Sequence, residues 1–122
     1  MADILVTQTA RKQIDKLSDT DAKAVDEALQ IIDKVTGEPI DLPGAPGRTS
    51  YLALSTRLQE GRAGPVIIYR PSQSTEHSDW VIVYLLSREQ YKDVRRAEGL
   101  VATTPAVRDI VNAFMSGTVD RI

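Results

Sequence analysis

The stretch GPVIIYRPSQSTEHSDWVIVYLLSREQY, from Gly64 to Tyr91, contains two apolar runs from which the fold can be predicted. Residues 66–69 (VIIY) and 80–86 (WVIVYLL) are rich in β-branched and aromatic side chains, which favour an extended backbone. The polar residues 71–79 between them predict a long loop, and therefore an antiparallel hairpin. Because residues 80–86 are apolar at nearly every position, we expect this strand to be covered on both faces, with helices across at least one.

The composition is that of one globular domain. The chain has 122 residues, enough for one hydrophobic core, and it is 42% hydrophobic and 26% charged. No apolar run approaches the roughly 20 residues that cross a bilayer, and the first residues lack the features of a secretory signal. We therefore expect a cytoplasmic protein. The absence of cysteine excludes disulfides and thiolate zinc, and a single histidine argues against a metal site, so no cofactor is predicted.

The charges are distributed unevenly along the chain. The net charge is −2, but residues 48–96 hold eight basic and five acidic side chains, and seven of these eight cations are arginine. Arginine presents a planar fork that suits phosphate and carboxylate groups. We expect these arginines to lie at one rim of the sheet, where an anionic partner can dock. The alternative is that they are ordinary solvated charges at strand ends and loops.

The first half of the chain predicts a strand followed by two helices. Residues 4–7 are a short apolar run, and residues 9–17 carry an apolar stripe with the spacing of a helix. Residues 18–35 predict a second helix, which begins at a Ser-Asp-Thr-Asp cap and ends before Gly37. The short join makes the two helices an antiparallel pair that covers one face of the sheet. Residues 37–49, rich in proline and glycine, predict a connection in which Leu42 is an anchor to the core.

The second half predicts a strand before the hairpin and two helices after it. Residues 51–58 alternate in polarity as a strand does, and residues 88–98 predict a short helix. Residues 104–116 carry a regular apolar stripe after a Thr-Pro start and predict a last helix. This stripe needs an apolar partner, which is either the sheet of the same chain or a groove in a second copy or partner protein. A homodimer through this helix is thus the alternative arrangement.

Four features appear in a fixed order: two amphipathic helices after the first strand, Leu42-Pro43-Gly44 leading to Tyr51-Leu-Ala-Leu54, the run Gly64-Pro-Val-Ile-Ile-Tyr69, and Arg88-Glu-Gln-Tyr91 after the last strand. Over residues 3–96 this order resembles the RelE/ParE toxin superfamily of bacterial toxin–antitoxin systems. The resemblance implies an α+β fold, β-α-α-β-β-β-α, in which a helical hairpin packs on an antiparallel β-sheet. The whole chain, 1–122, is then a single domain with a core over 3–96 and an extension over 97–122.

The resemblance also implies a function. Members are toxins that inhibit translation by ribosome-associated mRNA cleavage, as endoribonucleases, or inhibit DNA gyrase, and a cognate antitoxin protein silences them. In the nuclease branch the positions of Arg88 and Tyr91 would be catalytic, through stabilisation of phosphate charge and through base stacking or proton transfer. Nucleic-acid or partner-binding residues would come from the other arginines, namely Arg48, Arg57, Arg62, Arg70 and Arg95.

The resemblance leaves a second reading open. Leu52 and Leu54 stand where the family often places basic residues, and Ser87 stands where it sometimes has histidine. These differences favour the alternative of a RelE-fold binding or self-associating module without nuclease activity.

Overall fold

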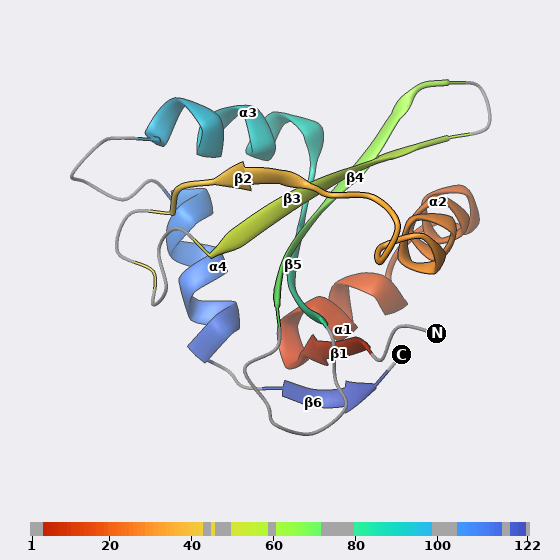
Figure 1. The fold of residues 1–122 in the computed structure, drawn as a ribbon, viewed down its shortest axis with the longest axis horizontal. Helices are drawn as coiled ribbons and strands as arrows, with labels where there is room; N and C mark the ends of the chain where they lie inside the picture. Colours follow the sequence, from red (N-terminus) through yellow and green to blue (C-terminus); the bar gives the residue numbers. More distant parts are fainter. Residues whose placement is uncertain are drawn as a thin grey trace.

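The computed structural model describes residues 4–42, 45, 50–58, 61–71, 80–98, 105–115 and 118–121. The helices occur in pairs before and after a run of strands, which is an α+β arrangement, as the sequence predicted (Figure 1). In chain order the elements are β1 (Ile4–Thr7), α1 (Gln8–Asp15), α2 (Asp19–Gln30), β2 (Glu38–Ile40), β3 (Tyr51–Arg57), β4 (Ala63–Pro71), β5 (Trp80–Leu86), α3 (Arg88–Ala97), α4 (Pro105–Met115) and β6 (Thr118–Arg121).

Among the described residues six strands form one sheet, in the order β2-β3-β4-β5-β1-β6. The prediction of a purely antiparallel sheet is wrong, because β1 runs parallel to β5, with Ile4 opposite Trp80. The other pairs are antiparallel, so the sheet is mixed. Two of its strands were not predicted. β2 lies within the segment expected to be a connection, and β6 follows the last helix.

The sheet has a hydrophobic core on each face. One core lies under α1 and α2 and includes Val25, Ile67 and Ile82. The other lies under α3 and α4 and includes Val66, Val83 and Ile110. Figure 1 shows the two helix pairs on opposite sides of the strands. The prediction that residues 80–86 are covered on both faces is confirmed.

Side chains at the helix starts explain where the first helices begin. Thr7 Oγ1 accepts a hydrogen bond from Ala10 N at 3.1 Å and donates one to Val83 O at 2.7 Å, so the cap of α1 is tied to β5. Ser18 caps α2 in the predicted position. α2 ends at Gln30, earlier than the apolar stripe suggested, because residues 31–34 continue as turns whose N–H groups, as in Ile31 and Ile32, bond to carbonyls three residues back. Ile32 still reaches the core and is buried.

The last helix packs against its own sheet. Ala106, Val107 and Ile110 are buried in the core under α3 and α4, and Ala113 is also buried, while Met115 is 69% exposed. The intramolecular position predicted for the apolar stripe is therefore the one that the structure shows. A homodimer through this helix stays a prediction. In the part of the chain that the structure describes, no helix has both the length and the apolar character needed to cross a membrane.

Candidate functional site

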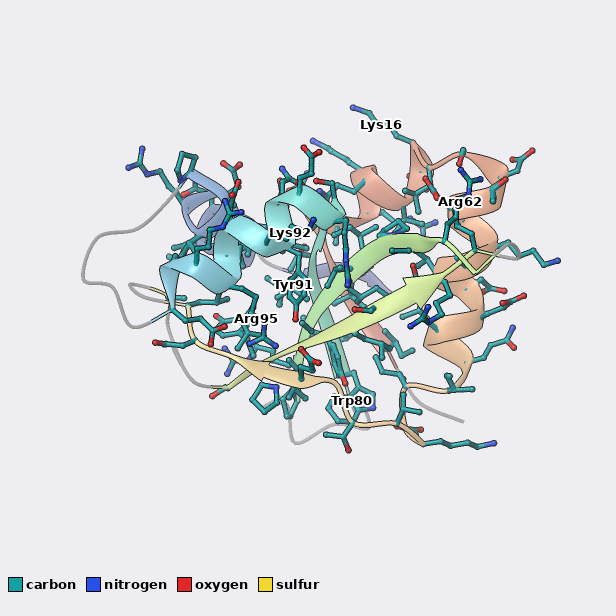
Figure 2. The ribbon with its side chains drawn as sticks, turned by 90° about the horizontal axis from the view of Figure 1, so that it is seen from above. Lys16, Arg62, Trp80, Tyr91, Lys92 and Arg95 are labelled. Carbon is teal, nitrogen blue, oxygen red and sulfur yellow. The ribbon has the colours of Figure 1, made fainter. Side chains whose placement is uncertain are left out.

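The candidate site is built on the first two turns of α3, which begins directly after β5. Ser87 accepts a hydrogen bond from Gln90 N, and the Gln90 side chain accepts one from Ser87 N, which forms a capping box. This cap fixes the start of the helix. Arg88, Tyr91 and Arg95 then recur at the spacing of neighbouring turns and lie on one side of α3. Figure 2 shows Tyr91 and Arg95 extending from α3 toward β2.

Tyr91 is a buried residue with a fully engaged hydroxyl. The side chain is 7% exposed, and its hydroxyl donates to Glu38 Oε2 at 3.0 Å and accepts from Arg95 Nε at 2.9 Å. The guanidinium groups of Arg88 and Arg95 lie 5.7 and 5.3 Å from the centre of the ring. Burial raises the pKa of Tyr91, and its hydrogen bond to Glu38 raises it further. The phenol is therefore protonated at neutral pH.

Arg95 ties α3 to the edge of the sheet. Its guanidinium pairs with Glu38 on β2 and with Glu98 Oε1 at 2.7 Å, and it donates to the carbonyl oxygen of Pro39 at 3.1 Å. Partial burial opposes the charged form, but hydrogen bonds with Glu98, Glu38 and Tyr91 outweigh this effect and raise the pKa of Arg95. Arg95 thus keeps its charge and has two carboxylate partners.

Glu38 is the residue of this site that the sequence did not indicate. Its side chain is 73% exposed, yet its carboxylate receives both the Tyr91 hydroxyl and the Arg95 guanidinium. The hydrogen bond from Tyr91 and then that from Arg95 lower the pKa of Glu38. Glu38 lies 53 residues before Tyr91 in the chain. No local pattern could have shown this pairing, because residues 37–49 read as a connection.

Arg88 is the open cation of the site. It is exposed, its Nη1 donates to Ser55 Oγ on β3 at 3.2 Å, and no carboxylate of a described residue forms an ion pair with it. Beside it a groove of about 340 Å³ opens between α1 and the start of β4, with Leu17, Pro65 and Leu85 among its lining residues. An anionic group can therefore approach the Arg88 guanidinium from solvent, whereas Glu38 occupies the adjoining donors of Tyr91 and Arg95.

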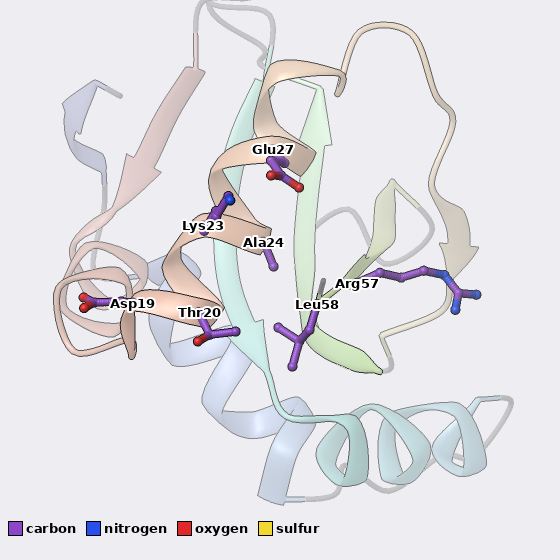
Figure 3. Close-up of a pocket in the computed structure, with 7 residues that line it drawn as sticks. All are labelled: Asp19, Thr20, Lys23, Ala24, Glu27, Arg57 and Leu58. Carbon is purple, nitrogen blue, oxygen red and sulfur yellow. The ribbon is translucent and has the colours of Figure 1, made fainter. Parts of the chain in front are cut away.

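The other predicted arginines do not all gather at this rim. Arg57 and Arg62 are exposed on the β3–β4 hairpin, and Arg62 lies at its far end (Figure 2). Arg57 also borders a cavity of about 200 Å³ beside α2, although Figure 3 shows its side chain pointing away from that helix. Arg70 is 5% exposed, with its guanidinium 5.4 Å from the centre of the Tyr51 ring, which places it in the interior. Arg48 lies outside the described residues.

The site thus joins Arg88, Tyr91 and Arg95 with Glu38, and no group of three or more metal-ligating side chains occurs within the described ranges. Such a site can bind an oxyanion through guanidinium and phenol donors. Comparison of the chain with protein-family models, with curated proteins and with solved structures finds no match in any of the three.

Proposed function

We propose that the chain is the toxin component of a type II toxin–antitoxin system of the RelE/ParE kind, acting in the cytoplasm. Support for this proposal comes from the order of the elements. A helical hairpin packs on one face of the β3-β4-β5 meander, and α3 follows that meander directly. The run from Gly64 to Tyr69 lies on β4, and Arg88 and Tyr91 lie on the first turns of α3.

We further propose that this toxin acts by holding its target and not by cutting RNA with Tyr91. A general base has to be within reach of the proton that it takes and has to be deprotonated at the working pH. Burial raises the pKa of Tyr91, and Arg95 donates a hydrogen bond to the phenol oxygen that would have to take the proton. Ser87 serves as a helix cap, and Leu52 and Leu54 pack against the core under α1 and α2. None of these four side chains, Tyr91, Ser87, Leu52 and Leu54, therefore provides a base or a phosphate-binding cation.

The single observation that carries the proposal is the exposed guanidinium of Arg88 beside Tyr91. Messenger RNA on the ribosome and DNA held by gyrase both carry phosphodiester groups, which an arginine fork binds through paired hydrogen bonds. Lys92 is exposed one turn further along α3 (Figure 2) and adds a second cation at helical spacing.

Expression of the chain in bacteria tests the proposal. We expect growth arrest that co-expression of the cognate antitoxin relieves, and we expect Arg88→Ala to weaken the arrest. Arg96→Ala is the matched control, since Arg96 lies on the same helix and its exposed side chain pairs with Asp93. Harmless expression of the wild-type chain would contradict the toxin function and favour the alternative of a binding module.

Purified components separate binding from cleavage. Translation by isolated ribosomes and supercoiling by gyrase should each be measured with increasing amounts of the chain. Inhibition of one of them in proportion to the bound chain, with intact RNA or DNA, is the expected result. Cleaved mRNA whose appearance depends on the Tyr91 hydroxyl would show that the chain is a nuclease after all.

A further inference from the structure

A carboxylate oxygen of Glu38 already accepts the hydrogen bonds that Arg95 and Tyr91 donate. Both donors converge on the same atom, Glu38 Oε2, with the Tyr91 hydroxyl at 3.0 Å. The Arg88 guanidinium lies over the same tyrosine ring and is close enough to lower the pKa of Glu38. The side chains on α3 are therefore arranged around an anion, and the anion in place is a carboxylate of the same chain.

Glu38 is held in a way that allows it to leave. Its side chain is 73% exposed, and β2 is a strand of three residues at the edge of the sheet, paired with β3 alone. Glu98, the second carboxylate partner of Arg95, lies three residues away at the C-terminal cap of α3, and its side chain is 30% exposed. If Glu38 leaves, Arg95 keeps Glu98 and does not become an isolated charge.

The charges of the site show what an incoming group must supply. The two cations, Arg88 and Arg95, equal in number the two carboxylates that pair with Arg95, Glu38 and Glu98. The departure of Glu38 therefore leaves one positive charge in this group of four. A phosphodiester carries one negative charge and can take the place of the carboxylate. A chain of phosphodiesters would also meet Lys92, which is exposed one turn beyond Arg88 on α3. Repeated cations favour a nucleic-acid backbone over a single acidic side chain.

We propose that Glu38 is an internal competitor for the anion site of Arg88, Tyr91 and Arg95, and that a phosphodiester of a single-stranded nucleic acid displaces it on binding. This inference rests on the proposed function, since it identifies the ligand of the same site. It predicts that the carboxylate of Glu38 keeps the affinity for nucleic acid below what the α3 donors alone would give.

The test measures the binding of a short fluorescein-labelled single-stranded RNA by fluorescence anisotropy, at one fixed low salt concentration. We expect Glu38→Gln to lower Kd by about two- to fivefold, the range of an exposed ion pair. Glu27→Gln is the matched control, with the same change of charge on α2 at the opposite face of the sheet. We expect its effect to be smaller, because salt screens distant charges.

Two more variants show whether the effect passes through Arg95. In an Arg95→Gln background, Glu38→Gln should give a smaller gain in affinity than in the wild type, which is the non-additivity that a double-mutant cycle shows for coupled residues. Glu38→Asp keeps the charge but withdraws the carboxylate from α3, so its Kd should lie between those of the wild type and Glu38→Gln. Thermal melts of every variant confirm that the folded state is being compared.

Equal effects of Glu38→Gln and Glu27→Gln would overturn the inference, and so would an unchanged Kd or the absence of RNA binding. Tighter binding of a glutamate-rich peptide than of the RNA would overturn the assignment of the ligand. The proposed function fails separately. RNA affinity that depends on Glu38 without growth arrest would refute the toxin role alone, whereas growth arrest without that dependence would refute the inference alone.

Discussion

Replacement of Ile110 by alanine tests whether α4 belongs to the fold of the single chain. Ile110 is fully buried in the core under α3 and α4, together with Val83 and Leu86. The substitution removes three carbons, which at about 0.8 kcal/mol for each gives about 2.4 kcal/mol of lost burial. The cavity that remains adds to this, so we expect the free energy of unfolding to fall by about 3–4 kcal/mol. The melting temperature should fall by about 12 °C.

Urea denaturation followed by circular dichroism measures this loss. Met115→Ala on the same helix is the control, because Met115 is 69% exposed and its truncation should cost less than about 0.5 kcal/mol. A loss below about 1 kcal/mol for Ile110→Ala would refute the packing described above. A transition midpoint that rises with protein concentration would also refute it, because the stripe would then be stabilised by a second copy.

Three other predictions concern the segment that leads into β2. Gly37→Ala should cost about 1–3 kcal/mol in urea denaturation, since a Cβ there would lie 2.7 Å from the Tyr69 hydroxyl and 2.9 Å from a backbone carbonyl of β3; a gain in stability would contradict this. Asp33→Ala should cost about 1 kcal/mol and shift the emission of Trp80, the single tryptophan, because the Asp33 carboxylate accepts a 2.6 Å hydrogen bond from its indole; unchanged emission would argue against that bond. Folding lowers the pKa of Glu38 from its ordinary 4.5, so the stabilisation by the Glu38 carboxylate is present above about pH 4.5 and is lost as the pH falls further. The difference in unfolding free energy between the wild type and Glu38→Gln should therefore shrink in acid. A difference that grows in acid would refute the ion pair.

The sequence predicted those parts of the fold that have a strong local pattern. The apolar stripe of residues 105–115 repeats at the period of a helix, and Pro105 suits the first helical position, so α4 was predicted correctly. The strand predicted from the alternation of residues 51–58 is confirmed as β3, in which Tyr51 and Ala53 lie in one core and Leu52 and Leu54 pack on the other. In these segments, local preference and tertiary packing agree.

The remaining features depend on contacts between distant residues. β2 has three residues and contains Pro39, which is typical of a connection and is compatible only with an edge strand. The parallel pairing of β1 with β5 joins residues 76 positions apart. In the site, Arg88 and Tyr91 were selected from the Arg88-Glu-Gln-Tyr91 motif on which the resemblance rests, but Glu38 reaches them only through the position of β2. The burial of Arg70 could not be predicted either, since an arginine at the end of an apolar run usually points to solvent.

The pairing of β1 with β6 has a consequence for how the chain responds to force. Leu5 lies opposite Arg121, so the outer ends of the first and last described strands lie side by side (Figure 1). Tension applied at those ends would open the ladder one hydrogen bond at a time, like a zipper, and would not load all its bonds at once. The same closeness suits circular permutation, because a short peptide could join the old ends while new ones are cut in a surface turn.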